Sequence, residues 1–229
     1  MLVETAKNRT KEQIINQYIV LRKERVMYCI LVTGIPAAGK STMADFLGER
    51  LKLPIISKDS IKELLFDTVG FESREEKVRL GAASMDIMYY VAKQLMKVGQ
   101  PFILENNFEN SSKAGLTSIL KDYKYSALTV TLTGEYKTIY QRFLERNVSP
   151  DRHRGHVVND CYPEKKERSI EELKAASIRY EDYLYGIEHR GFDAFCAEGE
   201  QIIVDTTDFA KVNLEELLGK IQAWKEKLS

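Results

Sequence analysis

The chain has few of the features that mark secreted or membrane proteins. Three of its 229 residues are cysteine, and Cys29, Cys161 and Cys196 form no C-x-x-C pair. Isolated cysteines are typical of proteins from a reducing compartment, because disulfide frameworks need regularly spaced pairs. The first residues, MLVETAKNRTKEQ, contain no apolar signal region, and no apolar run reaches the roughly 20 residues of a membrane span. These absences predict a cytoplasmic protein with no membrane partner.

An excess of one charge sign is also absent. The chain has 34 Lys plus Arg and 34 Asp plus Glu, which gives a formal net charge of +0. Proteins that bind long nucleic acids usually carry a basic excess, so an extended nucleic-acid partner is not expected, although a short basic groove is not excluded. There is no internal repeat or low-complexity tract, and the length suits one large domain over 1–229.

A specific motif is present in the stretch VMYCILVTGIPAAGKS, residues 26–41. An apolar, β-rich run leads into the G-x-x-x-x-G-K-[ST] pattern of a phosphate-binding loop. Glycines let backbone N–H groups converge on an anion, and the helix that follows directs its dipole at the same anion. We expect Lys40 to reach the β- and γ-phosphates and the Ser41 hydroxyl to ligate Mg²⁺. The predicted nucleotide-binding residues are Gly34, Ile35, Pro36, Ala37, Ala38, Gly39, Lys40, Ser41 and Thr42.

Strand and helix patterns alternate along the rest of the chain, which predicts an α/β fold with a parallel sheet and helices on both faces. Strands are expected at 26–33, 53–57, 101–105, 126–133 and 201–205. Helices are expected at 10–25, 73–98, 111–123, 135–146, 169–188 and 213–228. The helix over 10–25 is amphipathic and precedes the first strand, so it is an N-terminal addition. In the helix over 73–98 the stripe predicted to face the core is Val78, Ala82, Met85, Tyr89, Ala92 and Met96.

Two acidic residues are expected at the carboxyl ends of strands, where open α/β sheets bind their ligands. Ser60 and Glu63 fit a capping box that places Asp59 just before a helix, so Asp59 is a candidate general base for a substrate hydroxyl. The alternative is that Asp59 only complements the helix dipole. Glu105 ends the third apolar strand and is a candidate to hold a Mg²⁺-bound water or to orient the substrate. Its alternative is a structural hydrogen bond to a neighbouring loop.

The pattern of alternation breaks over residues 148–168, which are polar and rich in arginine. A mobile flap of this kind suits phosphoryl transfer, because guanidinium groups cover the transferring phosphoryl and closure excludes water. Arg146, Arg152 and Arg154 are the candidates. For each of them, a solvated surface arginine is the alternative.

Together the P-loop, Ser57–Lys62, Ile103–Asn107 and the arginine flap resemble a known group over about residues 27–208. It is the small P-loop kinases related to the 5′-kinase domain of phage polynucleotide kinase, to zeta toxins and to chloramphenicol phosphotransferase. The resemblance implies a three-layer P-loop NTPase fold, with a five-stranded parallel sheet of nucleoside-monophosphate-kinase type and a lid at 147–168.

The resemblance also implies roles for individual residues. Asp59 would take the proton of the acceptor hydroxyl, and Lys62, Glu105 and Asn107 would hold the acceptor. In polynucleotide kinases an arginine stands at the position of Lys62, and a lysine supplies a point charge where arginine supplies a bidentate fork. Arg146 would lie at the base of the lid with Arg152 as a second catalytic arginine, and adenine would lie between the Arg146 region and the loop near Thr206.

We therefore expect an ATP- and Mg²⁺-dependent kinase that phosphorylates a hydroxyl of a small-molecule acceptor, such as a metabolite, a sugar nucleotide or an antibiotic. One alternative is a polynucleotide 5′-hydroxyl kinase. Another is an NTP-binding regulatory or toxin-like module that uses the N-terminal helix for docking. The sequence carries no signal for the oligomeric state.

Overall fold

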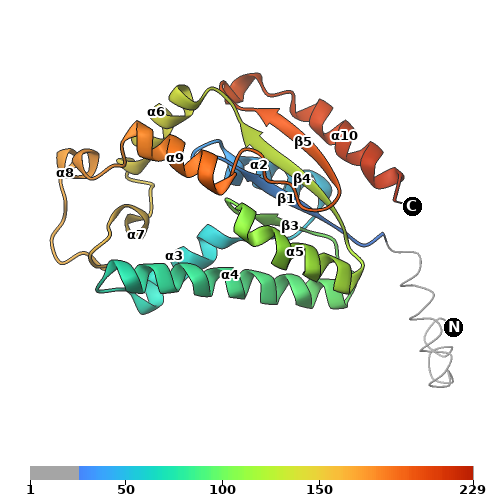
Figure 1. The fold of residues 1–229 in the computed structure, drawn as a ribbon, viewed down its shortest axis with the longest axis horizontal. Coiled ribbons are helices and arrows are strands. Elements are labelled where there is room, and N and C mark those ends of the chain that lie inside the picture. The colour runs from blue at the N-terminus through green and yellow to red at the C-terminus, as the bar shows by residue number, and fades with distance from the viewer. Residues whose placement is uncertain (1–25, 229) are drawn as a thin grey trace, which may run out of the picture.

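The computed structural model describes residues 26–228, which form a five-stranded parallel sheet with helices on both faces (Figure 1). The order of the strands across the sheet is β2-β3-β1-β4-β5. Their bounds are β1 (Tyr28–Gly34), β2 (Ile55–Ser57), β3 (Phe102–Glu105), β4 (Ser126–Thr133) and β5 (Glu200–Asp205). The predicted fold class is confirmed, whereas the predicted helix over 10–25 lies outside the described residues.

The helices follow the strands in the alternation that the sequence predicts. They are α2 (Lys40–Leu51), α3 (Lys58–Val69), α4 (Arg74–Lys97), α5 (Asn110–Tyr123), α6 (Tyr136–Asn147), α7 (Arg154–Val157), α8 (Ile170–Ala175), α9 (Tyr180–Arg190) and α10 (Leu214–Glu226), with a 3₁₀ turn, η2 (Phe209–Lys211). Within residues 26–228, the helices lack the length and apolar character that crossing a bilayer requires.

The single helix predicted over 169–188 is wrong, because the structure has two helices there, α8 and α9. The Ser177 hydroxyl donates a hydrogen bond to the Leu173 carbonyl at 3.1 Å, and Arg179 is extended before α9 begins. The Tyr140 hydroxyl of α6 also donates to the Ile178 carbonyl at 2.8 Å. This carbonyl is therefore held by a contact from another helix, which a local periodicity cannot reveal.

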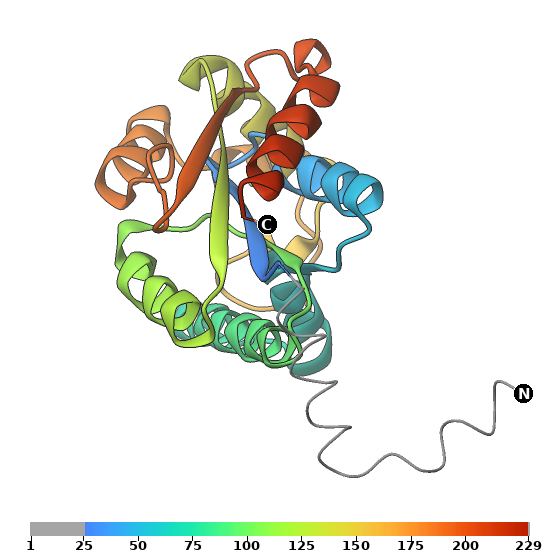
Figure 2. The same cartoon turned by 90° about the vertical axis from the view of Figure 1, so that its right-hand side faces the viewer.

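The two faces of the sheet are covered by different helices (Figure 2). The central strand β1 contributes side chains to the cores on both faces. Every residue of β1 is buried, as expected of a central parallel strand. Tyr28, Ile30 and Val32 belong to the core that contains side chains of α2, α6, α9 and α10. Cys29 and Leu31 belong to the opposite core, against α4 and α5. Because successive side chains of a strand point to opposite faces, and both faces are covered, residues 28–32 are all apolar.

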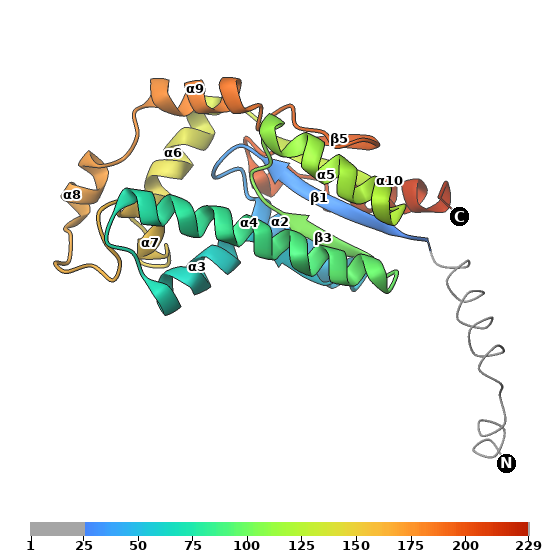
Figure 3. The same ribbon diagram turned by 60° about the horizontal axis from the view of Figure 1, so that its bottom comes forward.

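Helix α4 extends well beyond the strand that it covers. Its 24 residues span about 36 Å, whereas the four residues of β3 span about 13 Å. Only the second half of the predicted core stripe is therefore buried against the sheet, and Val78 and Ala82 are exposed, contrary to prediction. The first half of α4 lies beside α3 and the segment around α7 (Figure 3), where Phe66, Phe71 and Val158 form a small separate core.

The register of the strands brings their carboxyl ends together. Glu105 at the end of β3 is the Cα partner of Val32 in β1 and of Ser57 in β2. The residues that follow these three strands, including the P-loop and the start of α3, must therefore meet at one edge of the sheet.

Candidate functional site

The P-loop connects β1 to α2 and is held close to the neighbouring strand β4. Gly34 has a φ of 130°, and a Cβ placed on it would lie 2.0 Å from the Leu132 carbonyl oxygen. Gly39 has a φ of 90°, and a Cβ there would lie 2.6 Å from the Phe209 ring. Both glycines are thus required by contacts within the protein. Ala37 also adopts a positive φ, of 66°, a strained conformation for a residue with a side chain.

Lys40 is the first residue of α2 and is almost fully buried. Its ammonium donates a hydrogen bond to the Ile35 carbonyl at 2.9 Å, which holds the side chain across the loop. Burial lowers the pKa of Lys40 to about 8, and the nearby Glu105 charge opposes this shift. The side chains of Ser41 and Thr42 are exposed in the first turn of α2, where backbone N–H groups have no partner inside the helix.

Two residues that the sequence analysis did not assign clamp the P-loop from outside. Arg142 of α6 donates to the Ala37 carbonyl at 3.4 Å and to the Thr206 and Thr207 carbonyls at 3.1 and 3.0 Å. The Tyr183 hydroxyl of α9 donates to the Pro36 carbonyl at 2.9 Å. A signal for Arg142 was present, because it lies four residues before Arg146 and so on the same face of the helix.

Thr206 is placed differently from the nucleotide contact that we expected of its position. Its side chain is fully buried, and its hydroxyl donates to the Thr133 carbonyl at 3.0 Å. Its backbone carbonyl accepts a hydrogen bond from Arg142, which lines the pocket. A contact of this loop with adenine stays a prediction.

Asp59 lies inside the first turn of α3, so the predicted capping box at Ser60 and Glu63 is wrong. The N-cap is Ser57, whose hydroxyl accepts from the Ser60 N–H at 3.3 Å and donates to the Glu105 carboxylate at 2.5 Å. The helix starts earlier because Ser57 ends β2 with extended backbone and a side chain free to cap.

The Asp59 carboxylate is surrounded by positive charge. Burial opposes its ionisation, but His156, Lys58, Lys62 and Arg152 together lower its pKa below the usual value. Among residues 26–228, no group hydrogen-bonds this carboxylate. It is therefore ionised at neutral pH and free to accept a proton.

Glu105 differs from Asp59, although both carboxylates line the same pocket. Burial raises the pKa of Glu105, while the Lys40 charge and the hydrogen bond from Ser57 oppose the rise. The structural alternative, a hydrogen bond to a neighbouring segment, is thus present in the structure. A role toward metal or substrate stays a prediction.

One pocket of about 830 Å³ gathers most of the predicted site residues at the carboxyl edge of the sheet. Those that line it are Pro36, Ala37, Gly39, Lys40, Ser41, Thr42, Asp59, Lys62, Glu105, Asn107, Arg146 and Arg152. Gly34, Ile35, Ala38 and Thr206 do not line it. The first three support the loop from behind, and Thr206 faces β4.

The arginines of α6 and the flap have different surroundings. Arg146 and Arg152 both line the pocket, and the Nε atom of each is buried with no hydrogen-bond partner in the structure. Burial, and next the Arg152 charge, lower the pKa of Arg146 to about 10. Arg154 instead forms two hydrogen bonds to Glu164, at 2.7 and 2.9 Å, and lies outside the pocket. This placement favours the alternative for Arg154, a surface arginine, and its role toward the phosphoryl stays a prediction.

The flap is fixed to α3 and α4 by polar contacts. The His156 ring hydrogen-bonds Glu63 at 2.8 Å, and the His153 ring hydrogen-bonds Asp67 at 3.1 Å. Lys77 of α4 is 8% exposed and donates to the His156 carbonyl at 2.9 Å, the Val158 carbonyl at 2.5 Å and the Asn159 side chain at 3.1 Å. Nothing in the sequence singled out Lys77, because its partners lie about 80 residues away.

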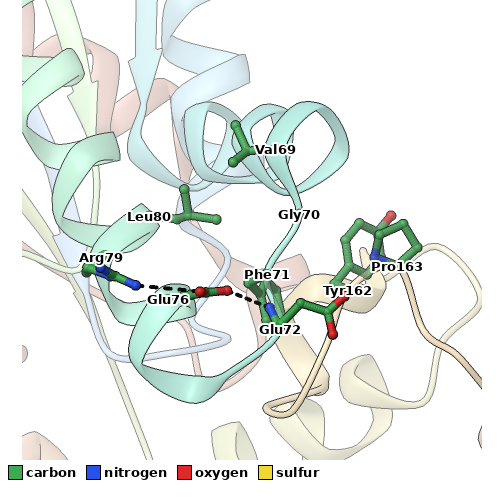
Figure 4. Close-up of a pocket in the computed structure, with 9 residues that line it drawn as sticks. All are labelled: Val69, Gly70, Phe71, Glu72, Glu76, Arg79, Leu80, Tyr162 and Pro163. Carbon is green, nitrogen blue, oxygen red and sulfur yellow. Dashed lines mark hydrogen bonds and ion pairs between the residues drawn. The ribbon is translucent and has the colours of Figure 1, made fainter.

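A second hollow, of about 400 Å³, lies at the turn between α3 and α4 (Figure 4). Its lining is largely apolar, and the side chain of Arg79 pairs there with Glu76 at 3.6 Å. Glu76 also accepts from the Glu72 N–H at 2.7 Å. Each charged side chain of this hollow has an ion-pair partner, Glu76 with Arg79 and Glu72 with Lys165, which lies outside the hollow. The larger pocket contains cations that are incompletely paired, so it is the candidate site.

Comparison with known proteins places the chain in a family and a fold. A family model described as AAA domain matches residues 30–170. No curated protein matches the chain. Among solved structures, a "putative kinase" from Chloroflexus aurantiacus j-10-fl is 22% identical, with a TM-score of 0.68, over 90% of this chain and 100% of that one. At this identity the likeness shows a shared fold and no more.

Two further solved structures are more distant. A gluconokinase from Sinorhizobium meliloti 1021 is 13% identical with a TM-score of 0.48, over 90% of this chain and 97% of its own. A shikimate kinase from Bacteroides thetaiotaomicron is 14% identical with a TM-score of 0.48, over 87% of this chain and 98% of its own. Both TM-scores are below 0.5, so these two likenesses carry no further argument about the fold.

Proposed function

This chain belongs to the AAA domain family, and we propose that it is an ATP-dependent kinase that transfers the γ-phosphoryl group to a hydroxyl of a small-molecule acceptor. The observation that carries the proposal is the meeting of three features in one pocket. They are a phosphate-binding loop with Lys40, an ionised carboxylate without a partner at Asp59, and two arginines with unpartnered Nε atoms.

The nucleotide half of the pocket suits a chain of phosphates. The N-terminal turn of α2 presents its free backbone N–H groups and the positive end of its dipole. Lys40 is held across the loop, where its ammonium would meet the β- and γ-phosphates. Arg146 and Arg152, whose buried Nε atoms have no hydrogen-bond partner among residues 26–228, supply further charge for the transferring phosphoryl. The adenine contact near Thr206 belongs to the same proposal.

The oxygen donors present also suit Mg²⁺, which prefers hard ligands. The Ser41 hydroxyl is exposed at the start of α2, and Glu105 lines the same pocket. These two residues would hold the ion. Magnesium, when bound, neutralises charge on the phosphates and helps to orient them.

Asp59 is assigned the role of general base. The acceptor hydroxyl gives its proton to the Asp59 carboxylate as its oxygen forms a bond to the γ-phosphorus. The bond from that phosphorus to the β,γ-bridging oxygen breaks, and ADP leaves with the electron pair. The flap residues 147–168 act as the lid that excludes water during the step. Lys62 and Asn107 line the acceptor side of the pocket and would hold the acceptor.

A direct test measures Mg²⁺-dependent ATP consumption across metabolites, sugar nucleotides, antibiotics and 5′-hydroxyl oligonucleotides. The variants are Asp59→Asn and, as a matched control, Asp122→Asn, an exposed carboxylate on α5. We expect one acceptor class to raise ATP turnover, and we expect Asp59→Asn to lower it by about 100- to 10,000-fold while ATP still binds. Asp122→Asn should leave turnover unchanged.

Other outcomes would overturn parts of the proposal. An Asp59→Asn variant that stays active on the acceptor found would remove Asp59 as the base. Stimulation by oligonucleotides alone, with strongly salt-dependent binding, would identify a polynucleotide kinase of the kind the sequence resembles. Tight ATP binding with no turnover on any hydroxyl would indicate a regulatory or toxin-like nucleotide-binding module.

A further inference from the structure

The acceptor side of the pocket holds more positive than negative charge. Lys58 and Lys62 of α3 and Arg152 of the flap line it, and the carboxylates that face them are Asp59 and Glu63. Glu63 already serves two groups, since its Oε1 lies 2.8 Å from His156 and 4.0 Å from Arg152. The carboxylates therefore do not compensate the cations around them.

Lys62 is the clearest case of an uncompensated charge. Among residues 26–228 it has no hydrogen bond or ion pair, and its ammonium lies 5.3 Å from the centre of the Phe66 ring. The end of the side chain also lies over Gly81 of α4, where a Cβ would come within 3.6 Å of it. A partly buried ammonium without an acceptor is unfavourable, so a ligand that supplies negative charge would stabilise this arrangement.

Arg152 of the flap lines the same pocket as Lys62. Its side chain is 16% exposed, its Nη1 is at the outer limit of an ion pair with Glu63, and its Nε has no partner. Burial lowers the pKa of both Lys62 and Arg152, because removal from water disfavours the charged form of each. Removing water from two such groups is costly unless an anion replaces it.

Lys62 and the P-loop lysine belong to different elements of the pocket. Lys40 begins α2, whereas Lys62 stands on α3 one turn after Asp59, and all three residues line the pocket.

The subsite is also built before any ligand arrives. Lys77 holds the chain at 156–159 to α4 with three hydrogen bonds, all to neutral acceptors, and so fixes the flap that carries Arg152. Burial lowers the pKa of Lys77 to about 7, so this side chain acts here through its hydrogen bonds. Preorganised cations of this kind bind anions well, because little ordering remains to be done on binding.

We propose that the acceptor of this kinase carries a small oxyanion, a phosphate or a carboxylate, beside its reacting hydroxyl, and that Lys62 binds this group. This inference rests on the proposed function. It excludes neutral and cationic acceptors such as unmodified sugars and aminoglycosides. The anion on one side and the P-loop on the other would place the hydroxyl next to Asp59.

The test uses matched acceptors that differ at one carbon, which carries either a hydroxyl or an anionic group: glycerol against glycerate and glycerol 3-phosphate, and glucose against glucuronate and glucose 6-phosphate. Within a set that supports turnover, we expect kcat/KM for an anionic member to exceed that of the neutral one by about 10- to 100-fold. Lys62→Met should remove most of this difference, Lys62→Arg should keep much of it, and Lys113→Met, an exposed lysine on α5, should keep all of it. The carboxylate and phosphate members show which oxyanion is preferred.

A binding experiment keeps the test independent of turnover. With a non-hydrolysable ATP analogue occupying the P-loop, calorimetry measures binding of 3-phosphoglycerate and inorganic phosphate to the wild type and to Lys62→Met. Binding that Lys62→Met weakens by about tenfold or more supports the subsite even if no acceptor is phosphorylated, in which case the kinase proposal alone fails. Equal turnover of neutral and anionic acceptors overturns the inference. So does the absence of anion binding that depends on Lys62.

Discussion

The two halves of the pocket are built in different ways. The nucleotide half is a contiguous stretch, residues 34–42, that turns tightly between β1 and α2 and whose backbone carbonyls accept hydrogen bonds from Lys40, Arg142 and Tyr183. The acceptor half is assembled from α3, α4 and the flap, and charged side chains hold it together. Close packing makes the first half rigid, whereas the second half depends on a few polar contacts over long sequence distances.

This comparison predicts that the halves fail differently. Changes in the nucleotide half should impair folding and ATP binding together, since the same backbone serves both. Changes in the acceptor half should alter turnover while ATP binding stays intact. The predictions below test this difference, from the largest expected effect to the smallest.

Gly34→Ala should have the largest effect, on stability. The added Cβ would meet the Leu132 carbonyl oxygen at 2.0 Å, and the φ of 130° strains any other residue. We expect a loss of about 3 kcal/mol or more in the free energy of unfolding, measured by chemical denaturation. Gly115→Ala in α5, where a Cβ would meet nothing within 4 Å, should stabilise slightly. Equal stabilities of the two variants would contradict this account of the loop.

Arg152→Met should lower turnover and spare ATP affinity. Arg152 lines the pocket, its Nε has no hydrogen-bond partner among residues 26–228, and its ion pair with Glu63 is long at 4.0 Å, so removing it takes away charge that faces the pocket. We expect kcat to fall by about 100-fold, as for other single groups that stabilise developing charge. Arg154→Met is the matched control, and it should cost far less because Arg154 pairs with Glu164 outside the pocket. A larger loss from Arg154→Met would reverse the assignment.

Lys77→Met should loosen the flap without touching the pocket directly. It removes three hydrogen bonds from the chain at 156–159 and leaves two carbonyls to find other partners. We expect kcat/KM for the acceptor to fall by about tenfold, with the Kd for ATP unchanged. Amide hydrogen exchange should become faster in the flap and stay unchanged in β1. Slower turnover with unchanged exchange would show that Lys77 acts in another way.

The pH dependence should show the smallest effect and separate the two halves. The pKa of Lys40 is lowered to about 8, so kcat/KM for ATP should decline as pH rises through about 8, as the ammonium loses its proton. The pKa of Asp59 lies below its usual value, so its carboxylate stays ionised above about pH 4 and adds no acid limb near neutrality. A Lys40→Arg variant should shift the alkaline limb upward. An acid limb above pH 5 that disappears in Asp59→Asn would contradict the account.

Electrostatics also set how stability responds to acid. The folded-state pKa of Asp59 is lowered, so its contribution to stability is present above its unfolded-state pKa and is lost as pH falls through the folded value. The raised pKa of Glu105 acts in the opposite direction, because its burial disfavours the ionised form. The two neighbouring carboxylates therefore respond differently because their surroundings differ.

Much of the site could be predicted from short stretches of sequence. The P-loop motif is contiguous, and the alternation of strands and helices identified the sheet. Asp59 and Glu105 follow strands whose carboxyl ends must meet, and the register of Ser57 with Glu105 brings them into one pocket. The helix start at Ser57 was missed, because two serines offered a cap and only the end of β2 distinguishes them.

The differences from expectation have a common cause, which is the packing of distant elements. Val78 fits the apolar stripe of α4 yet is exposed, because beyond the sheet the helix turns Lys77, and not Val78, toward the flap. Thr206 turns inward because the Thr133 carbonyl lies next to it, and Arg154 is withdrawn from the pocket by Glu164. Lys77 acts mainly through backbone carbonyls, which are present in every sequence and therefore give no signal.

The sequence by itself determined the local chemistry of this protein. It specified the strand, turn and helix of the P-loop, because these depend on neighbouring residues, and the layered fold, because apolar periodicity requires it. Only the tertiary structure decided which charges are satisfied and which are left over. Whether a charge is paired depends on its distance from opposite charges that are far away in the chain. Those distances follow from how α3, α4 and the flap pack. That packing leaves Lys62 and Arg152 facing the pocket without enough acid.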